Sequence, residues 1–496
     1  MALRSTFLLF FVLALSTEES LASVFSSKLI HRFSDEGRAS IRTPTWSDSL
    51  PEKQSSEYYR LLTSSDFRRQ RMNLGAKFQS LVPSEGSKTI STGNDFGWLH
   101  YTWIDIGTPS VSFLVALDTG SDLLWIPCNC VQCAPFKSTY YSSLATKDLN
   151  EYDPSSSSTS KVFLCSHKLC GSAPDCESPR EQCPYTVNYA TGNTSSSGLL
   201  VEDILHLTSN ANNRLMNASS SVKAQVVIGC GKKQSGVFLD GVAPDGLMGL
   251  GLGEISVPSF LSKAGLMRNS FSMCFDEVDS GRIYFGDMGP SMQQSTQFLP
   301  LDNKYVTYTV GVEACCIGNS CLKQTSFRTF IDSGQSFTFL PEGIYRKVAL
   351  EIDRHINATI KRVEGGSWDY CYETSVEPPK VPAIKLKFSH NNTFVIHKPL
   401  FVLQQTQGLV QFCLPISSSG RGGTGSIGQN YMRGYRMVFD RENMKLGWSA
   451  SKCQEDKIEP PQASPGSTSS PYPLPTEEQQ SRSHAVSPAI AVFTPR

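Results

Sequence analysis

Short runs of apolar, β-branched and aromatic residues alternate with turn-forming residues along the chain from about residue 98. The first three runs span 99–107, 111–117 and 123–127. Runs of this length, separated by Gly, Pro, Asn and Ser, are typical of β-strands. The pattern therefore predicts an all-β protein with strands in these three ranges.

The same pattern continues downstream. Residues 184–192 and 198–207 flank a polar turn, which predicts a hairpin. The segments 225–231 and 245–251 place apolar residues directly beside glycines, as a close approach between two backbones requires. Further strands are expected within 307–318.

One stretch shows the periodicity of a helix. Residues 342–356 are expected to form an amphipathic helix, with four apolar residues near one face: Ile344, Val348, Leu350 and Ile352. It is the clearest helical segment in a chain whose pattern otherwise favours strands.

Two segments place an acidic residue in a tight turn between apolar runs. In FLVALDTGSDLLWIP (113–127) this residue is Asp118, and in TFIDSGQSFTFLP (329–341) it is Asp332. The small hydroxyl residue and the glycine after each Asp suit a turn in which backbone and side-chain donors point at a carboxylate. The two segments therefore predict two similarly built carboxylate sites.

The elements around the two turns recur in the same order. Strand-like runs precede each Asp, and an apolar–Gly step follows later, at 247–249 after the first turn and at 427–428 after the second. A chain of 496 residues also exceeds what one hydrophobic core usually serves. We therefore predict a duplicated unit whose two lobes bring the two Asp residues together.

Composition narrows the class of function. Lys plus Arg and Asp plus Glu number 45 each, so the formal net charge is zero and no nucleic-acid partner is indicated. Residues 1–22 combine an early Arg, an apolar run and small residues, and we expect a cleaved secretory signal peptide. The chain shows no run of the length and apolarity that predicts a transmembrane segment.

The segments outside the predicted lobes are polar. Residues 23–95 are charged, with a basic run at 67–71 and no sustained strand alternation, and we interpret them as a pro-segment, with a solvated extension as the alternative. The two lobes are predicted at 96–300 and 301–453. Residues 454–496 are rich in Pro, Ser, Glu and Gln, which predicts a disordered tail with no signal for a glycolipid anchor.

The chain contains 15 cysteines, many of them in a Ser-rich insertion at 128–183. In a secreted chain they predict disulfides, and because the number is odd, one cysteine is free or pairs outside the chain. A zinc site built on Cys128, Cys130 and Cys133 is the alternative, but companion His residues at finger spacing are missing. Four sequons are candidate glycosylation sites: Asn193, Asn217, Asn357 and Asn391.

Paired carboxylates have a specific chemistry. When two of them lie about 3 Å apart they share one proton, because ionising both is costly. The ionised carboxylate can take a proton from a water that attacks a peptide carbonyl, while the protonated one hydrogen-bonds the carbonyl oxygen. This reaction needs no cofactor and no metal, and we expect neither.

The two Asp turns and the two apolar–Gly steps resemble those of the pepsin-like aspartic proteases, over about residues 98–453. Within that family, the Cys-rich insertion after Trp125 and the Leu-Ile-His-Arg stretch at 29–32 look like the plant nepenthesin-type branch. The resemblance implies a bilobal pepsin-like fold, in which two duplicated β-rich lobes flank the active-site cleft.

The resemblance also implies roles for individual residues. Asp118 and Asp332 would be the catalytic pair, Ser121 would hydrogen-bond Asp118, and Gly120 and Gly334 would complete the two turns.

Two aromatic residues would act from the first lobe. Tyr189 would lie on a flap formed by the 184–207 hairpin, and Trp125 would support it. Ordinary packing is the alternative for both side chains.

Three positions depart from the family pattern. Gln335 follows the second Asp-Ser-Gly where Ser or Thr is usual, and Ala190 with the sequon at Asn193 alters the flap. The closing motif at 426–429 ends in Gln where Asp is common. Both catalytic carboxylates are retained, so we expect activity, with a slow rate or a shifted pH optimum.

The sequence therefore predicts a secreted, monomeric aspartic endopeptidase that acts on extended polypeptides at acidic pH. The predicted location is the secretory pathway and the extracellular or cell-wall space, or a membrane if a longer form carries an anchor. A non-catalytic binding or inhibitor protein on the same scaffold is the alternative. The two Asp residues and the flap Tyr favour the protease, and Gln335 keeps the alternative open. The motifs of zinc and serine hydrolases, His-Glu-x-x-His and Gly-x-Ser-x-Gly, do not occur.

Overall fold

The structure is a computed structural model that describes residues 25–31 and most of 100–453. The internal gaps are 135–150, 171–175, 190–193, 209–220, 240, 242, 277–279, 302–303, 358–359, 364–367, 404–407 and 421. The predicted signal peptide, most of the predicted pro-segment and the predicted tail lie outside the described residues.

The strands predicted around the first Asp turn are confirmed. They are β2 (His100–Ile106), β3 (Val111–Asp118) and β4 (Leu124–Gln132). Phe113, Val115 and Leu117 are completely buried, because β3 lies inside a sheet that is covered on both faces. The apolar run before Asp118 therefore serves as a core strand that ends at the carboxylate.

The remaining strands of the first half follow in order: β5 (Lys161–Val162), β6 (Pro184–Tyr189), β7 (Thr194–Thr208), β8 (Ser221–Ser235), β9 (Leu247–Gly249), β10 (Ser270–Phe275), β11 (Ser280–Phe285) and β12 (Gln294–Gln297). The predicted hairpin corresponds to β6 and β7, which pair antiparallel from Pro184↔Leu199 to Tyr189↔Thr194. The helix α4 (Val257–Lys263) follows β9.

The second half contributes β13 (Thr309–Val312), β14 (Ala314–Ile317), β15 (Ser320–Cys321), β16 (Phe327–Ile331), β17 (Thr338–Leu340), β18 (Lys361–Val363), β19 (Cys371–Thr374), β20 (Ile384–Lys387), β21 (Thr393–Ile396), β22 (Phe401–Val402), β23 (Val410–Cys413), β24 (Ile416–Ser418), β25 (Gly425–Ile427), β26 (Tyr435–Asp440) and β27 (Lys445–Ala450). Its helices are α5 (Glu342–Asp353) and α6 (Gln429–Met432).

Among the described strands, the largest sheet has 14 members and draws on both halves of the chain. Its path runs β12-β27-β26-β10-β11-β1-β2-β3-β9-β4-β8-β7-β5, with β6 paired to β7. Strands β13, β16, β25, β17 and β24 form a separate sheet that contains the second Asp turn. Two four-stranded sheets complete the second half, β15-β14-β20-β21 and β18-β19-β23-β22.

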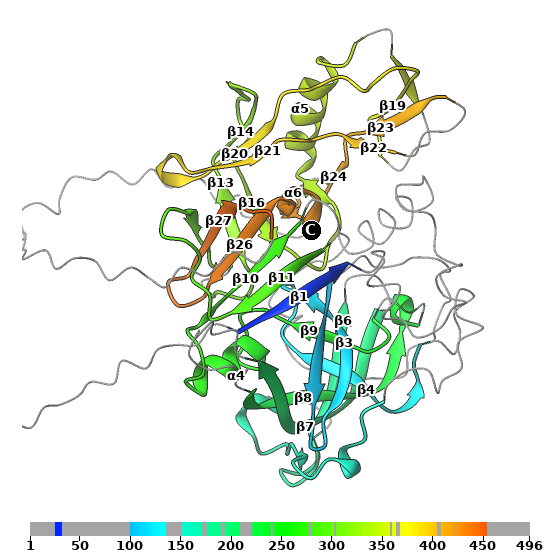
Figure 1. Ribbon diagram of the computed structural model, residues 1–496, viewed down its shortest axis with the longest axis vertical. Coiled ribbons are helices and arrows are strands. Elements are labelled where there is room, and N and C mark those ends of the chain that lie inside the picture. Colours follow the sequence, from blue (N-terminus) through cyan, green and yellow to red (C-terminus); the bar gives the residue numbers. More distant parts are fainter. Residues whose placement is uncertain are drawn as a thin grey trace, which may run out of the picture. The chain divides into compact units, whose positions relative to one another are not determined.

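Part of the predicted pro-segment, residues 25–31, forms a strand. This corrects the sequence analysis, which found no sustained strand alternation within 23–95. β1 (Phe25–His31) pairs antiparallel with β11, from Phe25↔Phe285 to Ile30↔Ser280, and its end pairs with β2. Figure 1 shows β1, in dark blue, beside these strands. Its sequence, FSSKLIH, has too little alternation to stand out, and the two neighbouring strands supply the pairing.

The predicted helix is confirmed as α5, with one correction. Ile344, Val348 and Ile352 are buried as expected, but Leu350 is 49% exposed. At about 100° per residue, position 350 lies on the side of the helix opposite to that stripe. Tyr345 is buried beside the stripe instead. No helix in the described part of the chain has the length and apolar character needed to cross a bilayer.

The duplication predicted from the sequence is visible in the strand pairing. β9 lies parallel to β3, with Gly249 opposite Asp118. β25 lies parallel to β16, with Ile427 opposite Ile331, the residue before Asp332. Each apolar–Gly step therefore lies beside the strand that ends at a carboxylate.

Close packing explains the glycine in each step. A Cβ on Gly249 would lie 2.3 Å from the backbone of Asp122 in the first turn, and one on Gly428 would lie 2.5 Å from the carbonyl oxygen of Phe337 in the second. A side chain at either position would push a strand away from its Asp turn.

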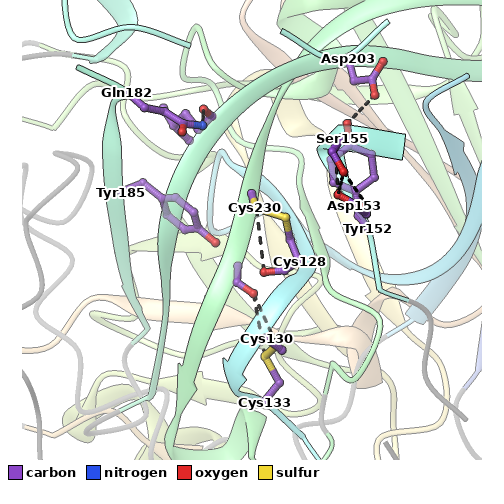
Figure 2. Close-up of a disulfide and its surroundings, with 12 residues drawn as sticks. Cys128, Cys130, Cys133, Tyr152, Asp153, Ser155, Gln182, Tyr185, Asp203 and Cys230 are labelled. Carbon is purple, nitrogen blue, oxygen red and sulfur yellow. Dashed lines mark hydrogen bonds between the residues drawn. A yellow bond between two sulfur atoms is a disulfide. The ribbon is translucent and has the colours of Figure 1, made fainter. Parts of the chain in front are cut away.

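The cysteines form seven disulfides, as predicted, and leave Cys315 as a buried free thiol. The pairs are Cys128–Cys230, Cys130–Cys133, Cys165–Cys176, Cys170–Cys183, Cys274–Cys453, Cys316–Cys321 and Cys371–Cys413. Figure 2 shows the first two, where they join the start of the insertion to β8 and close the turn after β4. The three sulfurs of the alternative zinc site are therefore oxidised and cannot act as thiolate ligands.

Candidate active site

The first turn surrounds the Asp118 carboxylate with donors. Asp118 is the last residue of β3 and is completely buried. The backbone N–H of Gly120 donates to its Oδ1 at 2.9 Å, and the Ser121 hydroxyl donates to its Oδ2 at 2.8 Å. Each carboxylate oxygen thus has a partner from within the same turn.

The second turn repeats this arrangement at Asp332. Asp332 directly follows β16 and is 6% exposed. Its backbone N–H donates to the carbonyl of Ile427 at 3.1 Å, and the N–H of Gly334 donates to its Oδ1 at 2.9 Å. The glycines at 120 and 334 therefore make equivalent contacts in the two turns.

The two turns are joined to each other through Thr119 and Ser333. The N–H of Thr119 donates to the Ser333 hydroxyl at 3.1 Å, and the N–H of Ser333 donates to the Thr119 hydroxyl at 2.9 Å. Each hydroxyl then donates across to the opposite strand, Thr119 to the carbonyl of Ile331 and Ser333 to that of Leu117. These buried bonds hold together the two loops that contain Asp118 and Asp332.

Tyr189 and Trp125 are in direct contact. The indole Nε1–H of the completely buried Trp125 donates to the hydroxyl of Tyr189 at 2.8 Å. Burial and, after it, the negative charge of Asp118 raise the pKa of Tyr189, so its hydroxyl remains protonated. Because Asp118 acts on that hydroxyl, the end of β6 and the first carboxylate share one environment.

Phe238 belongs to the same cluster and was missed by the sequence analysis. Its ring centroid lies 5.0 Å from that of Trp125 and 4.9 Å from that of Tyr189, in an edge-on arrangement with the latter. These distances are typical of favourable aromatic pairs. Phe238 ends the short 3-10 helix Gly236–Phe238 that follows β8, which is too short to give a periodicity that would have marked it.

Two family models match the chain, described as "Xylanase inhibitor N-terminal" over residues 100–287 and "Xylanase inhibitor C-terminal" over residues 308–450. The chain is 86% identical over 497 residues to Aspartic proteinase-like protein 1 of Arabidopsis thaliana, covering 100% of this chain and 94% of that protein. The chain belongs to the pepsin-like aspartic protease family.

More distant members agree. Aspartyl protease family protein 1 of Arabidopsis thaliana is 37% identical over 95% of this chain and 92% of its own length. Aspartic proteinase nepenthesin-2 of Nepenthes gracilis is 25% identical over 71% of this chain and 77% of its own length.

Solved structures support the bilobal pepsin-like fold. Basic 7S globulin from soybean matches with a TM-score of 0.54 and 19% identity, covering 72% of this chain and 92% of that one. Conglutin gamma from lupine seeds matches with a TM-score of 0.54 and 18% identity, covering 73% and 93%. The fold class predicted from the sequence is confirmed.

In this chain Gln335 follows the second Asp-Ser-Gly, where Ser or Thr is usual in the family. Gln335 is 1% exposed, its Nε2 donates to the carbonyl of Phe337 at 2.6 Å, and its Oε1 accepts from the Ser426 hydroxyl at 2.8 Å. Its carbonyl accepts from the N–H of Gln429 at 2.9 Å. Gln335 thus ties the second Asp turn to the closing strand β25 and to α6.

The second departure, Gln429, also supports the turn. Gln429 is completely buried, and its Nε2 donates to the carbonyl of Ser333. Two glutamine amides therefore brace the Asp332 turn, whereas the Asp118 turn has the Ser121 hydroxyl. The sequence marked both positions as departures, but it did not show that they contact one another.

The structure describes two of the four candidate glycosylation sites. Asn357 and Asn391 are exposed, while Asn193, Asn217 and the flap residue Ala190 lie outside the described residues. The sulfurs of Cys165, Cys170 and Cys176 lie within 4.8 Å of one another, but all three belong to disulfides, so they offer no thiolate to a metal.

Proposed function

We propose that the protein is an aspartic endopeptidase whose catalytic groups are Asp118 and Asp332. The observation that supports this most directly is the reciprocal bonding of Thr119 and Ser333, because it holds two equivalent Asp turns against each other. Peptide hydrolysis by paired carboxylates requires such fixed proximity.

The two carboxylates would act as one acid–base unit. The ionised member takes a proton from a water molecule, and that water attacks the peptide carbonyl. The protonated member donates a hydrogen bond to the carbonyl oxygen and later supplies a proton to the leaving amine. The donors from Gly120, Ser121 and Gly334 hold the carboxylates in place while the proton moves.

The β6–β7 hairpin would close over a bound peptide. The Trp125–Tyr189 bond fixes the end of β6, and Phe238 adds apolar surface beside it. A substrate with apolar side chains next to the cleaved bond fits this environment. Water would be displaced from the carboxylates as the peptide binds, which strengthens their electrostatic effect.

We further propose secretion through an oxidising compartment, with acidic working conditions and a cleaved pro-segment. Seven disulfides suit that compartment. The exposed sequons at Asn357 and Asn391 are sterically open to glycosylation.

A non-catalytic binding protein is the second candidate. The matching family models are described as xylanase inhibitor domains, and Gln335 replaces the usual hydroxyl residue after the second turn. Such a protein would use the same scaffold to bind another secreted enzyme, and both carboxylates would then be dispensable.

One experiment separates the two candidates. The full chain is expressed with its pro-segment, acidified, and assayed on casein from about pH 3 to 7, with and without a statine-type inhibitor. The protease proposal expects cleavage that the inhibitor blocks and that Asp332→Ala abolishes. Absence of cleavage across this range, or undiminished cleavage by Asp332→Ala, leaves the binding protein as the better candidate.

A further inference from the structure

A carboxylate outside the catalytic pair lies in the first Asp turn. Asp122 follows Ser121, and its Oδ1 accepts the backbone N–H of Gly253 at 2.8 Å. A Cβ on Gly251 would lie 2.3 Å from this Oδ1, and one on Gly253 would lie 2.5 Å from the Asp122 Cγ. The two glycines therefore leave a space that the carboxylate fills.

The loop that surrounds Asp122 is also bonded to the backbone of the catalytic turn. The N–H of Leu250 donates to the carbonyl of Asp118 at 2.9 Å, and that of Gly251 donates to the carbonyl of Ser121 at 2.8 Å. With the Asp122–Gly253 bond these contacts attach residues 249–253 along one side of the turn. Of these three bonds, the first two go to backbone carbonyls and the third, from the Gly253 N–H, goes to the side chain of Asp122.

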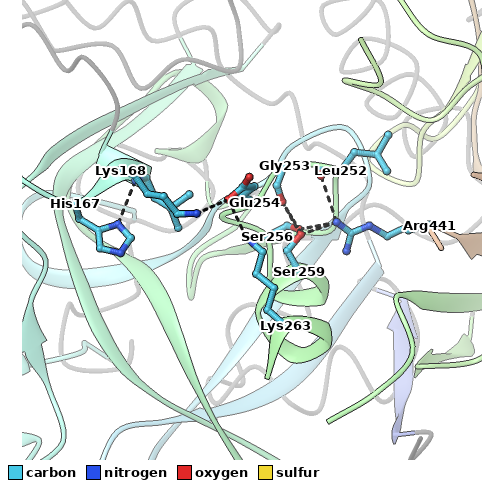
Figure 3. Close-up of polar contacts among 10 residues, drawn as sticks. His167, Lys168, Leu252, Gly253, Glu254, Ser256, Ser259, Lys263 and Arg441 are labelled. Atoms are coloured by element: carbon cyan, nitrogen blue, oxygen red, sulfur yellow. Dashed lines mark hydrogen bonds and ion pairs between the residues drawn. The ribbon is translucent and has the colours of Figure 1, made fainter. Parts of the chain in front are cut away.

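Arg441 holds the outer side of the same loop. It directly follows β26, is 5% exposed, and its Nη2 donates to the Ser259 hydroxyl at 2.6 Å and to the carbonyl of Leu252 at 3.3 Å. Ser256 lies beside Nη2 at 3.5 Å. Figure 3 shows the guanidinium of Arg441 directed into this loop from the second half of the chain.

The guanidinium brings an incompletely bonded positive charge to the site. Within the described residues, the Nε and Nη1 atoms of Arg441 have no hydrogen-bond acceptor. A buried cation of this kind is stabilised by a nearby carboxylate. Asp122 interacts electrostatically with Arg441, and the buried phenol of Tyr308 interacts with both.

We propose that Asp122 is a positioning residue for Asp118, acting through the backbone of loop 249–253, and that Arg441 supports it from the outer side of that loop. The inference rests on the proposed function, because positioning matters only if Asp118 is catalytic. This aspartate, which the sequence analysis passed over, would thus help to set the shape of the site.

Ionisable groups from three parts of the chain face Asp122. The groups that face it are Asp118 in its own turn, Arg441 from the turn after β26, and Tyr308 from the segment before β13. Burial raises the pKa of Asp122, and the Gly253 N–H and the Arg441 charge oppose that rise. The net shift favours the protonated carboxyl, whose Oδ1 can still accept the Gly253 N–H.

The test compares two variants of the activated full chain. Asp122→Asn keeps an oxygen that can accept the Gly253 N–H but removes the charge. It should keep kcat and KM close to those of the wild type, because the bond to loop 249–253 is retained. Asp122→Ala removes the bond as well, and kcat should fall roughly ten- to a hundredfold with little change in KM, because Asp118 is displaced.

Arg441→Met tests the outer support. Arg441→Met and Asp122→Ala should each lower kcat. The double variant should lower kcat by less than the product of the two single fold-losses, because both residues act through one loop. The control is Asp287→Asn. The Asp287 carboxylate is not part of either Asp turn, and it forms an ion pair with Arg436 at 2.6 Å that the variant removes. This control should lower Tm and leave kcat unchanged.

The outcomes separate this inference from the proposed function. If the wild type cleaves and Asp122→Ala keeps its kcat, the inference is wrong and the protease proposal stands. If the wild type does not cleave, amide hydrogen exchange of Leu250, Gly251 and Gly253 decides instead. Asp122→Ala should speed exchange there at least tenfold relative to Asp287→Asn, and unchanged exchange would overturn the positioning role.

Discussion

Thr119 and Ser333 exchange hydrogen bonds across 214 residues of sequence, the backbone N–H of each donating to the side-chain hydroxyl of the other at 3.1 and 2.9 Å. Each hydroxyl also donates to a carbonyl of the opposite strand. The geometry of the two Asp turns thus depends on two small hydroxyl residues that follow the carboxylates.

Removing either hydroxyl should therefore destabilise the junction. Thr119→Ala or Ser333→Ala leaves a buried N–H and a buried carbonyl without their partners, and each should lower the free energy of unfolding by about 1–3 kcal/mol. The double variant should cost less than the sum, because both residues belong to one network. Urea unfolding at neutral pH measures this coupling, and strict additivity would contradict a shared network.

Tyr189 and Trp125 provide a second prediction. Tyr189→Phe and Trp125→Phe each remove the 2.8 Å bond between the two side chains. Each should lower kcat/KM by roughly tenfold, because the hairpin no longer closes in a fixed position. The double variant should be little worse than either single one.

Tyr185 is a matched control for this prediction. It lies on the same strand, β6, is fully buried, and its hydroxyl bonds to Ser196 at 2.9 Å. Tyr185→Phe should lower stability without a comparable loss of kcat/KM. An equal loss in Tyr185→Phe would mean that the hairpin acts only through its packing.

Gln335 offers a third prediction. Gln335→Thr restores the hydroxyl that is common in the family but removes the contacts to Phe337 and Ser426. It should lower the free energy of unfolding by about 1–3 kcal/mol, since both partners are buried. It should also move the pH optimum, because a short hydroxyl beside Asp332 can donate to the carboxylate. An unchanged pH profile would mean that the Gln335 amide already serves Asp332, or that no donor is needed at this position.

The buried residue His100 should make the stability of the protein depend on pH. Burial, then the charge of Arg433, lowers the pKa of His100 from 6.5 to about 3, while a hydrogen bond with Gln429 opposes the shift. The unfolded chain therefore binds a proton at a higher pH than the folded chain. The contribution of His100 to stability is fully present above pH 6.5 and is lost as pH falls toward 3, by roughly 3–5 kcal/mol in all.

His100→Phe removes this titration and keeps a ring beside Phe275, whose centroid lies 5.2 Å away. The variant should lose less stability than the wild type between pH 7 and about pH 4, as measured by urea unfolding at each pH. Parallel losses in the two proteins would show that His100 is not held neutral in the folded state.

The sequence predicted the parts of the site that local pattern determines. The runs before Asp118 and Asp332 are core strands, so their apolar character marked them, and the glycines beside them followed from close packing. The two carboxylates could be paired before the structure because the elements around them repeat in order.

Other parts depend on contacts between distant segments and left no local signal. β1 forms because β11 and β2 flank it, and Phe238 joins the aromatic cluster from a single 3-10 turn after β8. Arg441 reaches the loop beside Asp122 from a turn more than 300 residues later in the chain. The disulfide partners likewise depend on which strands are neighbours, as for Cys128 and Cys230 on β4 and β8.

We propose that Asp118 and Asp332 act as one acid–base unit on peptide bonds. The most direct measurement is kcat/KM for a peptide substrate across acidic pH, with the wild type, Asp118→Asn, Asp332→Asn and the double variant. We predict a bell-shaped profile for the wild type and losses of about 10³-fold or more in each single variant, with no further loss in the double variant. A single variant that cleaves at the wild-type rate would contradict the account.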